Sequence, residues 1–152
     1  MLENGGLYFS RGDLLEDRFE GSYTNSTIQK RPQIYQVFAD QLNKNGDPVT
    51  GDELSQEVAD LFRKSVNLVY VNCWHQNEYE SVAMWKLYAP ANESIAIVST
   101  VKKLIDALDD SCIVSSVTYL DYGKDHIDDW NMFSGFLHKR ISFEHERESC
   151  VP

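Results

Sequence analysis

The sequence predicts a single mixed α+β domain, in which helices pack on a mostly antiparallel sheet. Three observations lead to this prediction. The 152 residues fit one domain. Segments rich in β-branched and aromatic residues are interspersed with segments of helical apolar spacing. The helical segments also differ in length, which is not typical of a regular doubly wound sheet. We therefore expect residues 1–152 to form one domain.

One short strand and two amphipathic helices are predicted in the first part of the chain. Leu7–Ser10 has the composition of a strand. Apolar residues recur at helical spacing over Ile34–Leu42, and Pro32 stands near the expected helix start. Asn45–Pro48 should end this helix. The capping-box pattern of Thr50-Gly51-Asp52-Glu53 should begin the second helix. We expect both helices to pack against the sheet.

The rest of the chain is predicted to contain four further strands and three helices. Residues with high β-propensity define the strands, and helix caps precede the first two helices. The strands are expected at Leu68–Cys73, Ser94–Val98, Cys112–Tyr122 and Ser142–Glu148. Asn77 is the expected cap of one helix, Ser99 or Thr100 caps the next, and the last passes through Phe133–Leu137.

The predicted strand Ser142–Glu148 carries the first set of candidate catalytic residues. Its alternation places Glu144 and Glu146 on one face. Two carboxylates two residues apart on a strand lie roughly 6.5–7 Å apart. At that separation one can act as an acid and the other as a base. A solvated edge strand would show the same alternation, and charges there discourage aggregation.

Composition excludes some classes of function. The net charge is −10, which disfavours broad non-specific binding to nucleic-acid phosphates. No apolar run approaches the roughly 20 residues that a membrane-spanning helix needs, so we expect no membrane association. The first residues lack the basic and apolar segments of a signal peptide, and a cytoplasmic location is therefore expected.

The cysteines predict neither a disulfide framework nor a metal site. Cys73, Cys112 and Cys150 are an odd number and lie far apart in the sequence. This pattern fits reduced thiols better than a disulfide scaffold. The four His and three Cys also show no ligand spacing for zinc, so no metal ligands are expected.

A second set of candidate residues lies where the strand at Leu68–Cys73 leads into the next helix. Trp74 could stack on a planar ligand, and His75 could titrate near neutral pH. Glu80 lies in the same junction. Two further residues of this block, Met84 and Trp85, are interpreted as core.

Basic residues supply candidate ligand-binding groups. Arg11 follows the first predicted strand and could grip a phosphate or carboxylate, although a solvated loop charge is the simpler interpretation. Lys139 and Arg140 are adjacent and precede the predicted carboxylate strand. They could pair with its glutamates or hold a phosphate.

Six motifs together resemble the uncharacterised bacterial domain-of-unknown-function family 2971. The resemblance covers about residues 7–148. It implies a bacterial source but no reaction, because the family has no agreed activity. The motifs are Tyr8-Phe9-Ser10-Arg11-x-Asp13, Phe19-Glu20-Gly21, Asn72-Cys73-Trp74-His75, Glu80-Ser81-x-Ala83-Met84-Trp85-x-x-Tyr88, Val117-x-Tyr119-x-Asp121-Tyr122 and Lys139-Arg140-x-x-Phe143-Glu144-His145-Glu146-Arg147.

The chain departs from that family at both ends. Members usually carry an aromatic and basic strand before the Tyr-Phe-Ser segment, and this chain has none. Members also continue past the Glu-x-Glu-Arg segment with an apolar strand residue, whereas this chain continues as Ser149–Pro152. We therefore expect a fragment or a diverged gene product, with an open sheet edge.

The order of the candidate residues is also similar to that in ADP-ribosyltransferase-like domains. This likeness implies a nucleotide- or NAD-handling enzyme, with Arg11 holding the NAD pyrophosphate. Glu146 would stabilise the charge that develops as the glycosidic bond breaks. Trp74 or Tyr8 would flank the nicotinamide ring, and Glu144 would orient the acceptor. NAD is the cofactor that this hypothesis names.

A non-enzymatic function remains the alternative. The aromatic surface around Trp74 could instead recognise a small ligand or a protein partner, as in a stress or phage-defence system. The two hypotheses differ in one structural expectation. An enzyme should bring Arg11, His75 and Glu146 to a single concave pocket.

Overall fold

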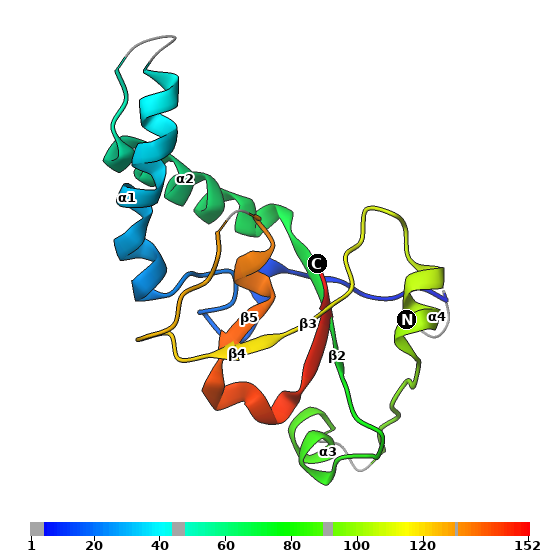
Figure 1. The fold of residues 1–152 in the computed structure, drawn as a ribbon. Coiled ribbons are helices and arrows are strands. Elements are labelled where there is room, and N and C mark those ends of the chain that lie inside the picture. Colours follow the sequence, from blue (N-terminus) through cyan, green and yellow to red (C-terminus); the bar gives the residue numbers. More distant parts are fainter. Residues whose placement is uncertain (1–4, 44–47, 90–92, 130) are drawn as a thin grey trace.

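Four strands from distant parts of the chain form the main sheet in the computed structural model, which describes residues 5–43, 48–89, 93–129 and 131–152 (Figure 1). The sheet is antiparallel with the order β1-β2-β6-β3. Its strands are β1 (Ser10–Arg11), β2 (Tyr70–His75), β6 (Glu148–Val151) and β3 (Ser115–Ser116). A second, parallel pair joins β4 (Thr118–Leu120) to β5 (His138–Arg140). The predicted mixed α+β class is confirmed.

Strand β6 lies at the centre of the main sheet, between β2 and β3. All four of its residues are buried, and Cys150 and Val151 have no exposed surface. Cys150 belongs to a core cluster with Val71 and Phe136. Most of the segment Ser149–Pro152, where the sequence departs from the family 2971 pattern, belongs to this central strand.

The first helices are α1 (Asn25–Leu42) and α2 (Gly51–Ser65). The predicted capping box of α2 is present, with Thr50 and Glu53 exchanging hydrogen bonds. Helix α1 begins seven residues before Pro32, because the Thr24 side chain caps it, so the expected start near Pro32 is wrong. The expected break at Asn45–Asp47 lies outside the described residues.

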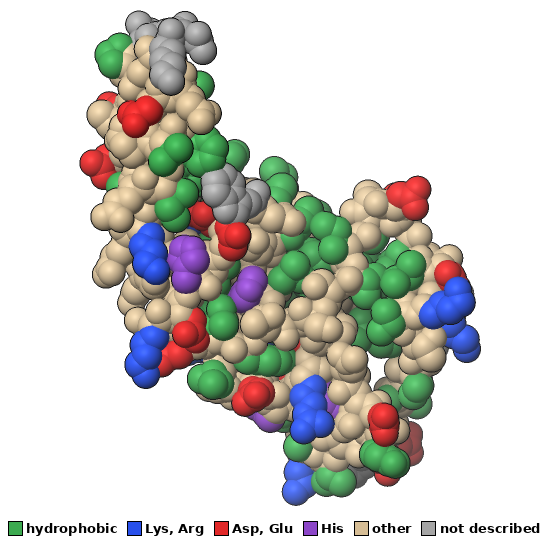
Figure 2. Space-filling view, in the orientation of Figure 1, with side chains coloured by type: hydrophobic (Ala, Val, Ile, Leu, Met, Phe, Trp, Pro, Cys, Tyr) green, Lys and Arg blue, Asp and Glu red, His purple; other side chains and the backbone are tan. Residues whose placement is uncertain are grey.

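Helices α1 and α2 form a hairpin that projects from the sheet (Figures 1 and 2). Their main tertiary contacts are with each other. This arrangement differs from the expected packing of both apolar stripes against the sheet. The hairpin is attached at its base, where Thr27 bonds to the backbone of Ile127 and Arg31 pairs with Asp129.

The next two helices are α3 (Val82–Tyr88) and α4 (Val101–Ala107). Thr100 caps α4, in agreement with the sequence, whereas α3 is capped by Ser81 and not by Asn77. Segment 94–98 is not a strand, and Val98 is 90% exposed. Figure 2 shows hydrophobic side chains gathered beside α4. No helix in the described ranges is long and apolar enough to cross a membrane.

Short 3-10 helices replace several predicted elements. They are η1 (Gly12–Leu14), η2 (Val66–Leu68), η3 (Ser134–Phe136) and η4 (Ile141–Glu146). The predicted strand Cys112–Tyr122 is broken into β3 and β4. The predicted strand Ser142–Glu148 is wrong, because η4 occupies most of it. Arg147 then adopts a left-handed conformation, with φ 42°, and turns the chain into β6. Glu144 and Glu146 therefore do not share a strand face.

Candidate functional site

A buried cluster of charges surrounds Lys139, the middle residue of β5. Its ammonium Nζ lies 2.8 Å from Glu20 Oε1 and 3.2 Å from Glu146 Oε2. It also contacts Glu148 Oε2. All four side chains are 10% exposed or less. One cation thus faces three carboxylates in a region that water hardly reaches.

The chain reaches this cluster through tight local turns. Gly21 has a φ of 77° and lies against the Phe136 ring, where a Cβ atom would come within 2.8 Å of that ring. Its amide also donates to the Gly135 carbonyl at 3.0 Å. Glycine adopts such a conformation without steric cost. This turn holds the preceding residue, Glu20, beside Lys139.

Burial and the neighbouring charges shift the pKa values of the groups in this cluster in opposite directions. Burial raises the pKa of Glu148 and of Glu20, and the nearby Lys139 only partly offsets this effect. Burial alone would lower the pKa of Lys139, but its ion pairs with Glu148 and Glu20 outweigh burial and raise it. Lys139 therefore stays protonated, whereas the two glutamates take up protons more readily than in water.

We expect replacement of Glu20 with Gln to make the protein progressively more stable, relative to wild type, as the pH rises. The folded-state pKa of Glu20 is raised above its unfolded value. The stability that its carboxyl group contributes is therefore present at low pH and is lost as the pH rises through the folded pKa. Gln has no proton to lose. Urea unfolding of both proteins, from about pH 4.5 upward, measures the difference.

The exposed Glu57 on α2 provides the control for this experiment. The replacement Glu57→Gln should leave the pH dependence unchanged. A constant stability difference between Glu20→Gln and wild type across that pH range would contradict the expected effect of burial.

Two tyrosines connect the cluster to its surroundings. The Tyr88 hydroxyl donates a hydrogen bond to Glu146 Oε1 at 3.0 Å. The Tyr119 hydroxyl accepts one from the Glu148 amide at 2.8 Å. Burial raises the pKa of both hydroxyls, so they remain neutral at physiological pH. Tyr88 belongs to α3 and therefore links the buried carboxylate to a pocket beside that helix.

This aromatic pocket has a volume of about 770 Å³. It is bounded by the end of β2, the following turn, α3 and segment 94–99. The aromatic residues that line it are Trp74, Tyr79, Trp85 and Tyr88, and the acidic ones are Glu78, Glu80 and Glu148. Trp85 Nε1 donates to Glu80 Oε2 at 3.3 Å, which holds one aromatic ring beside a carboxylate. His75 and Cys73 also line the pocket.

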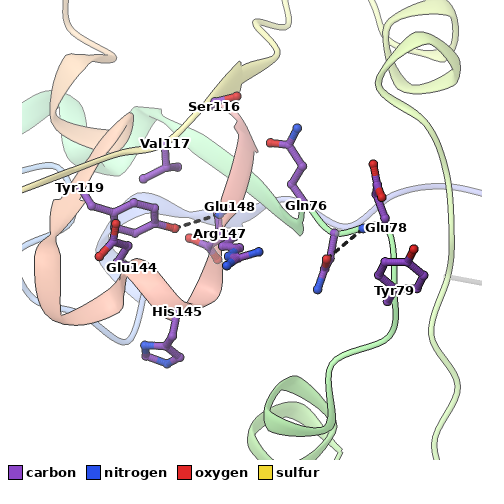
Figure 3. Close-up of a pocket in the computed structure, with 11 residues that line it drawn as sticks. Gln76, Glu78, Tyr79, Ser116, Val117, Tyr119, Glu144, His145, Arg147 and Glu148 are labelled. Carbon is purple, nitrogen blue, oxygen red and sulfur yellow. Dashed lines mark hydrogen bonds between the residues drawn. The ribbon is translucent and has the colours of Figure 1, made fainter.

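A wider basin, of about 1170 Å³, lies beside the aromatic pocket. Figure 3 shows Tyr119, Glu144 and Arg147 on one side of it, and Gln76 and Tyr79 on the other. Both Glu144 and Arg147 are exposed. The basin is open to solvent and has few apolar walls, so the aromatic pocket is the better candidate for binding a small molecule.

Paired residues of β2 and β6 connect the charge cluster to the aromatic pocket, because Glu148 belongs to both. Cys73 lies opposite Cys150, and His75 lies opposite Glu148. The two cysteines are joined by a disulfide. The expectation of reduced thiols is therefore wrong for this pair, because distant positions become neighbours once the strands pair. His75 Nδ1 lies 2.5 Å from the Glu146 carbonyl oxygen.

Five of the nine predicted site residues come together in this region. His75, Trp74 and Glu80 line the aromatic pocket, and Lys139 and Glu146 lie in the charge cluster behind it. The hydrogen bond from Tyr88 to Glu146 connects the two groups.

The other predicted residues lie elsewhere or have other partners. Arg11 pairs with Asp13 at 2.5 Å, and Tyr70, its partner on β2, is five residues before His75, or roughly 16 Å along the strand. Tyr8 is 64% exposed, and Glu144 faces the open basin. The convergence of Arg11 with His75 and Glu146 that an enzyme should show is therefore not found among the described residues.

Arg140 is already occupied by protein groups. Its guanidinium forms two hydrogen bonds to the carboxylate of Asp17, at 2.8 and 3.2 Å. The same group lies over the rings of Phe19 and Phe143, at 4.4 and 5.1 Å from their centroids. These contacts give Arg140 a structural role in holding the N-terminal segment on η4, rather than the phosphate-binding role that the sequence suggested.

Several important residues were missed at the sequence level. Glu20 and Glu148 complete the charge cluster, yet they lie 128 positions apart and share no motif spacing. Glu148 was visible only as part of the alternation from which a strand was predicted. The atoms that Cys73, Glu148 and Cys150 offer as metal ligands lie within 4.8 Å of one another. Spacing along the sequence could not reveal this group, because its members come from two paired strands.

Comparisons with protein families, with curated proteins and with solved structures each find no match to this chain.

Proposed function

We propose that this protein binds a small, planar, positively charged ligand in the aromatic pocket, and that the nicotinamide ring of NAD is such a ligand. One observation carries the proposal. Four aromatic side chains and three glutamates line the pocket, and no Lys or Arg is among the described residues that line it.

The physical reason is electrostatic. The faces of Trp and Tyr rings carry negative partial charge and attract cations, and the attraction grows where water is excluded. Glu80 adds a full negative charge beside Trp85. A flat ring can also stack on these side chains, as bases stack on aromatic platforms. The pocket volume falls within the range of sites that take small molecules.

In this proposal the pocket recognises NAD through its nicotinamide ring, and not through its phosphates as the sequence suggested. Arg11 and Arg140 are held by Asp13 and Asp17, so neither is aimed at a ligand in the aromatic pocket. Because Arg11 does not join His75 and Glu146, the proposal is ligand binding, and enzymatic handling of NAD stays a prediction in which Glu146 would act through its hydrogen bond with Tyr88. The likeness to family 2971 and the cytoplasmic location stay predictions.

Matched ligand pairs test the proposal. NAD and NADH differ in the charge of the nicotinamide ring but share both phosphates, and 1-methylnicotinamide, which is methylated on the ring nitrogen, is the cationic counterpart of nicotinamide. We expect the cationic member of each pair to bind about 5- to 30-fold more tightly, which corresponds to a cation–π contribution of roughly 1–2 kcal/mol. Isothermal titration of the oxidised protein, freed of metal with a chelator, gives the affinities.

Variants locate the binding. Trp85→Ala and Glu80→Gln should each weaken the binding of 1-methylnicotinamide, since both residues line the pocket. Tyr8→Ala is the control, because Tyr8 is an exposed aromatic residue that is not among those lining the pocket. Equal affinity for NAD and NADH, or a loss of binding in Tyr8→Ala alone, would argue against a site for a planar cation.

A further inference from the structure

Four residues with metal-binding side chains share one face of the β2–β6 ladder. Cys73 pairs with Cys150 across the two strands, and His75 pairs with Glu148 two residues further along β2. Side chains two residues apart on a strand point to the same face. The four side chains therefore form two adjacent rungs, with Trp74 and Ser149 between them on the opposite face.

The ligand atoms of three of these residues already lie close together. The sulfur atoms of Cys73 and Cys150 and a carboxylate oxygen of Glu148 are all within 4.8 Å of one another. Tetrahedral zinc takes sulfur ligands at about 2.3 Å, which places two such sulfur atoms roughly 3.8 Å apart. These three ligand atoms thus need only a small adjustment to surround one ion, whereas His75 Nε2 lies outside the group and must move closer to complete it.

His75 supplies an independent observation. Its Nδ1 lies 2.5 Å from the Glu146 carbonyl oxygen, and a carbonyl can only accept a hydrogen bond. Nδ1 therefore carries a proton, and Nε2 is the nitrogen that can offer a lone pair to a metal ion. That Nε2 atom is buried and has no hydrogen-bond partner among the described residues. Histidines that ligate metals usually donate their other nitrogen to a carbonyl or carboxylate in this way.

The charge cluster also favours a cation at this place. Glu148 and its neighbours Glu20 and Glu146 share a single buried cation, Lys139. Glu148 Oε2 has no well-directed hydrogen bond although Lys139 lies beside it. A divalent ion bound by Glu148 would offset the excess negative charge, and Lys139 would keep its pairing with the other two carboxylates.

We propose that reduction of the Cys73–Cys150 disulfide creates a site for a divalent transition metal, Zn²⁺ above all, with Cys73, Cys150, Glu148 and His75 Nε2 as its ligands. A dithiol reductant supplies two electrons and two protons, the S–S bond breaks, and the dithiol becomes a disulfide. Zn²⁺ then displaces the two thiol protons into solvent. Glu148 binds the ion through a carboxylate oxygen, and His75 binds it through the lone pair of Nε2.

The site is therefore controlled by the redox state. In the oxidised protein both sulfur atoms are tied to each other, and only the carboxylate and the imidazole remain. In a reducing compartment the thiols are free and the metal can bind. Disulfides that form in such compartments are usually transient or redox-sensing, which is consistent with this behaviour. Because Cys73, His75 and Glu148 line the aromatic pocket, the bound ion would lie at the wall of that pocket.

Cobalt binding tests the proposal on the whole chain. The protein is reduced with a dithiol, freed of reductant without oxygen, and titrated with Co²⁺. We expect one equivalent to bind with thiolate-to-cobalt charge-transfer absorption and the intense visible bands of tetrahedral cobalt, and Zn²⁺ to displace it. The oxidised protein should give neither band. A reduced protein without these bands, or equal binding by the oxidised protein, would overturn the proposal.

Variants identify the ligands. A competing chromogenic chelator measures zinc affinity, which we expect to fall more than about 100-fold in Cys150→Ser and in His75→Gln, because losing even an outer partner of a ligand costs 10- to 100-fold. Cys112→Ser and His145→Gln are matched controls, since neither residue belongs to the ladder. Unchanged zinc affinity in His75→Gln would refute the four-ligand site.

Because Cys150 is fully buried, the Cys150→Ser substitution can itself unfold the protein. Far-ultraviolet circular dichroism reports its folding. If it unfolds, the cobalt spectrum of the reduced wild-type protein alone decides for or against thiolate ligation. The ligand experiments of the proposed function use oxidised, metal-free protein, so the two proposals can fail independently.

Discussion

Replacing Lys139 with Met will destabilise the fold by about 3–5 kcal/mol at neutral pH. Lys139 is the cation that offsets Glu20, Glu146 and Glu148, and all four side chains are nearly or fully buried. Without it, three carboxylates must either remain charged in a region of low dielectric or take up protons. Both outcomes cost free energy. Urea unfolding at neutral pH gives the free energy of unfolding for comparison with wild type.

The loss of stability in Lys139→Met should be smaller at acid pH, because protonated carboxyl groups carry no charge for Lys139 to offset. Lys102→Met is the matched control. Lys102 also pairs with a carboxylate, that of Asp106, but its side chain is 84% exposed. Exposed ion pairs contribute little to stability. Equal effects of the two substitutions would show that burial of the Lys139 cluster does not govern its energy.

Replacing Asp129 with Ala will also cost about 3–5 kcal/mol, because it leaves a buried guanidinium without its counter-ion. Arg31 Nε lies 2.5 Å from Asp129 Oδ2, and both side chains are 4% exposed. The guanidinium also lies over the rings of Tyr23 and Phe62, at 4.5 and 5.5 Å from their centroids. Its Nη2 is buried without a hydrogen-bond partner in the described residues. The charge therefore depends heavily on Asp129.

A double variant shows how much of this loss comes from leaving the Arg31 charge without a partner. Arg31→Met combined with Asp129→Leu removes both charges, and we expect it to recover most of the lost stability, since apolar pairs often replace buried ion pairs at little cost. Thermal unfolding followed by circular dichroism compares both variants with wild type. A double variant less stable than Asp129→Ala would mean that this site tolerates no apolar side chains of that shape.

Local signals in the sequence predicted the helices better than the strands. The capping box at Thr50 and the cap at Thr100 are confirmed, because each depends only on residues within one turn. The strand predicted at Ser142–Glu148 is wrong, although its alternation is regular. Burial of Glu146 against Lys139 and the left-handed turn at Arg147 decide the backbone there, and both depend on the tertiary fold.

The part of the candidate site that lies within one local segment could be predicted from the sequence, and the part that depends on tertiary contacts could not. His75, Trp74 and Glu80 lie within one short segment, and the structure places all three at one pocket. Lys139 and Glu146 were selected as charged residues, but their burial was not foreseen. Glu20, Cys150 and Glu148 reach the site only through the pairing of β2 with β6 and the turn at Gly21. Spacing along the sequence carries no signal for such contacts.

The position of β6 beside β2 has a consequence for how fast the protein folds. Cys73 and Cys150 pair across a sequence separation of 77 residues, so the centre of the sheet cannot begin as a local hairpin. The α1–α2 hairpin, by contrast, is built from contacts between neighbouring segments. Closing a long loop has an entropic cost that must be met before any contact across it stabilises the chain. We therefore expect the helical hairpin to form early and the sheet to form last, as the rate-limiting step.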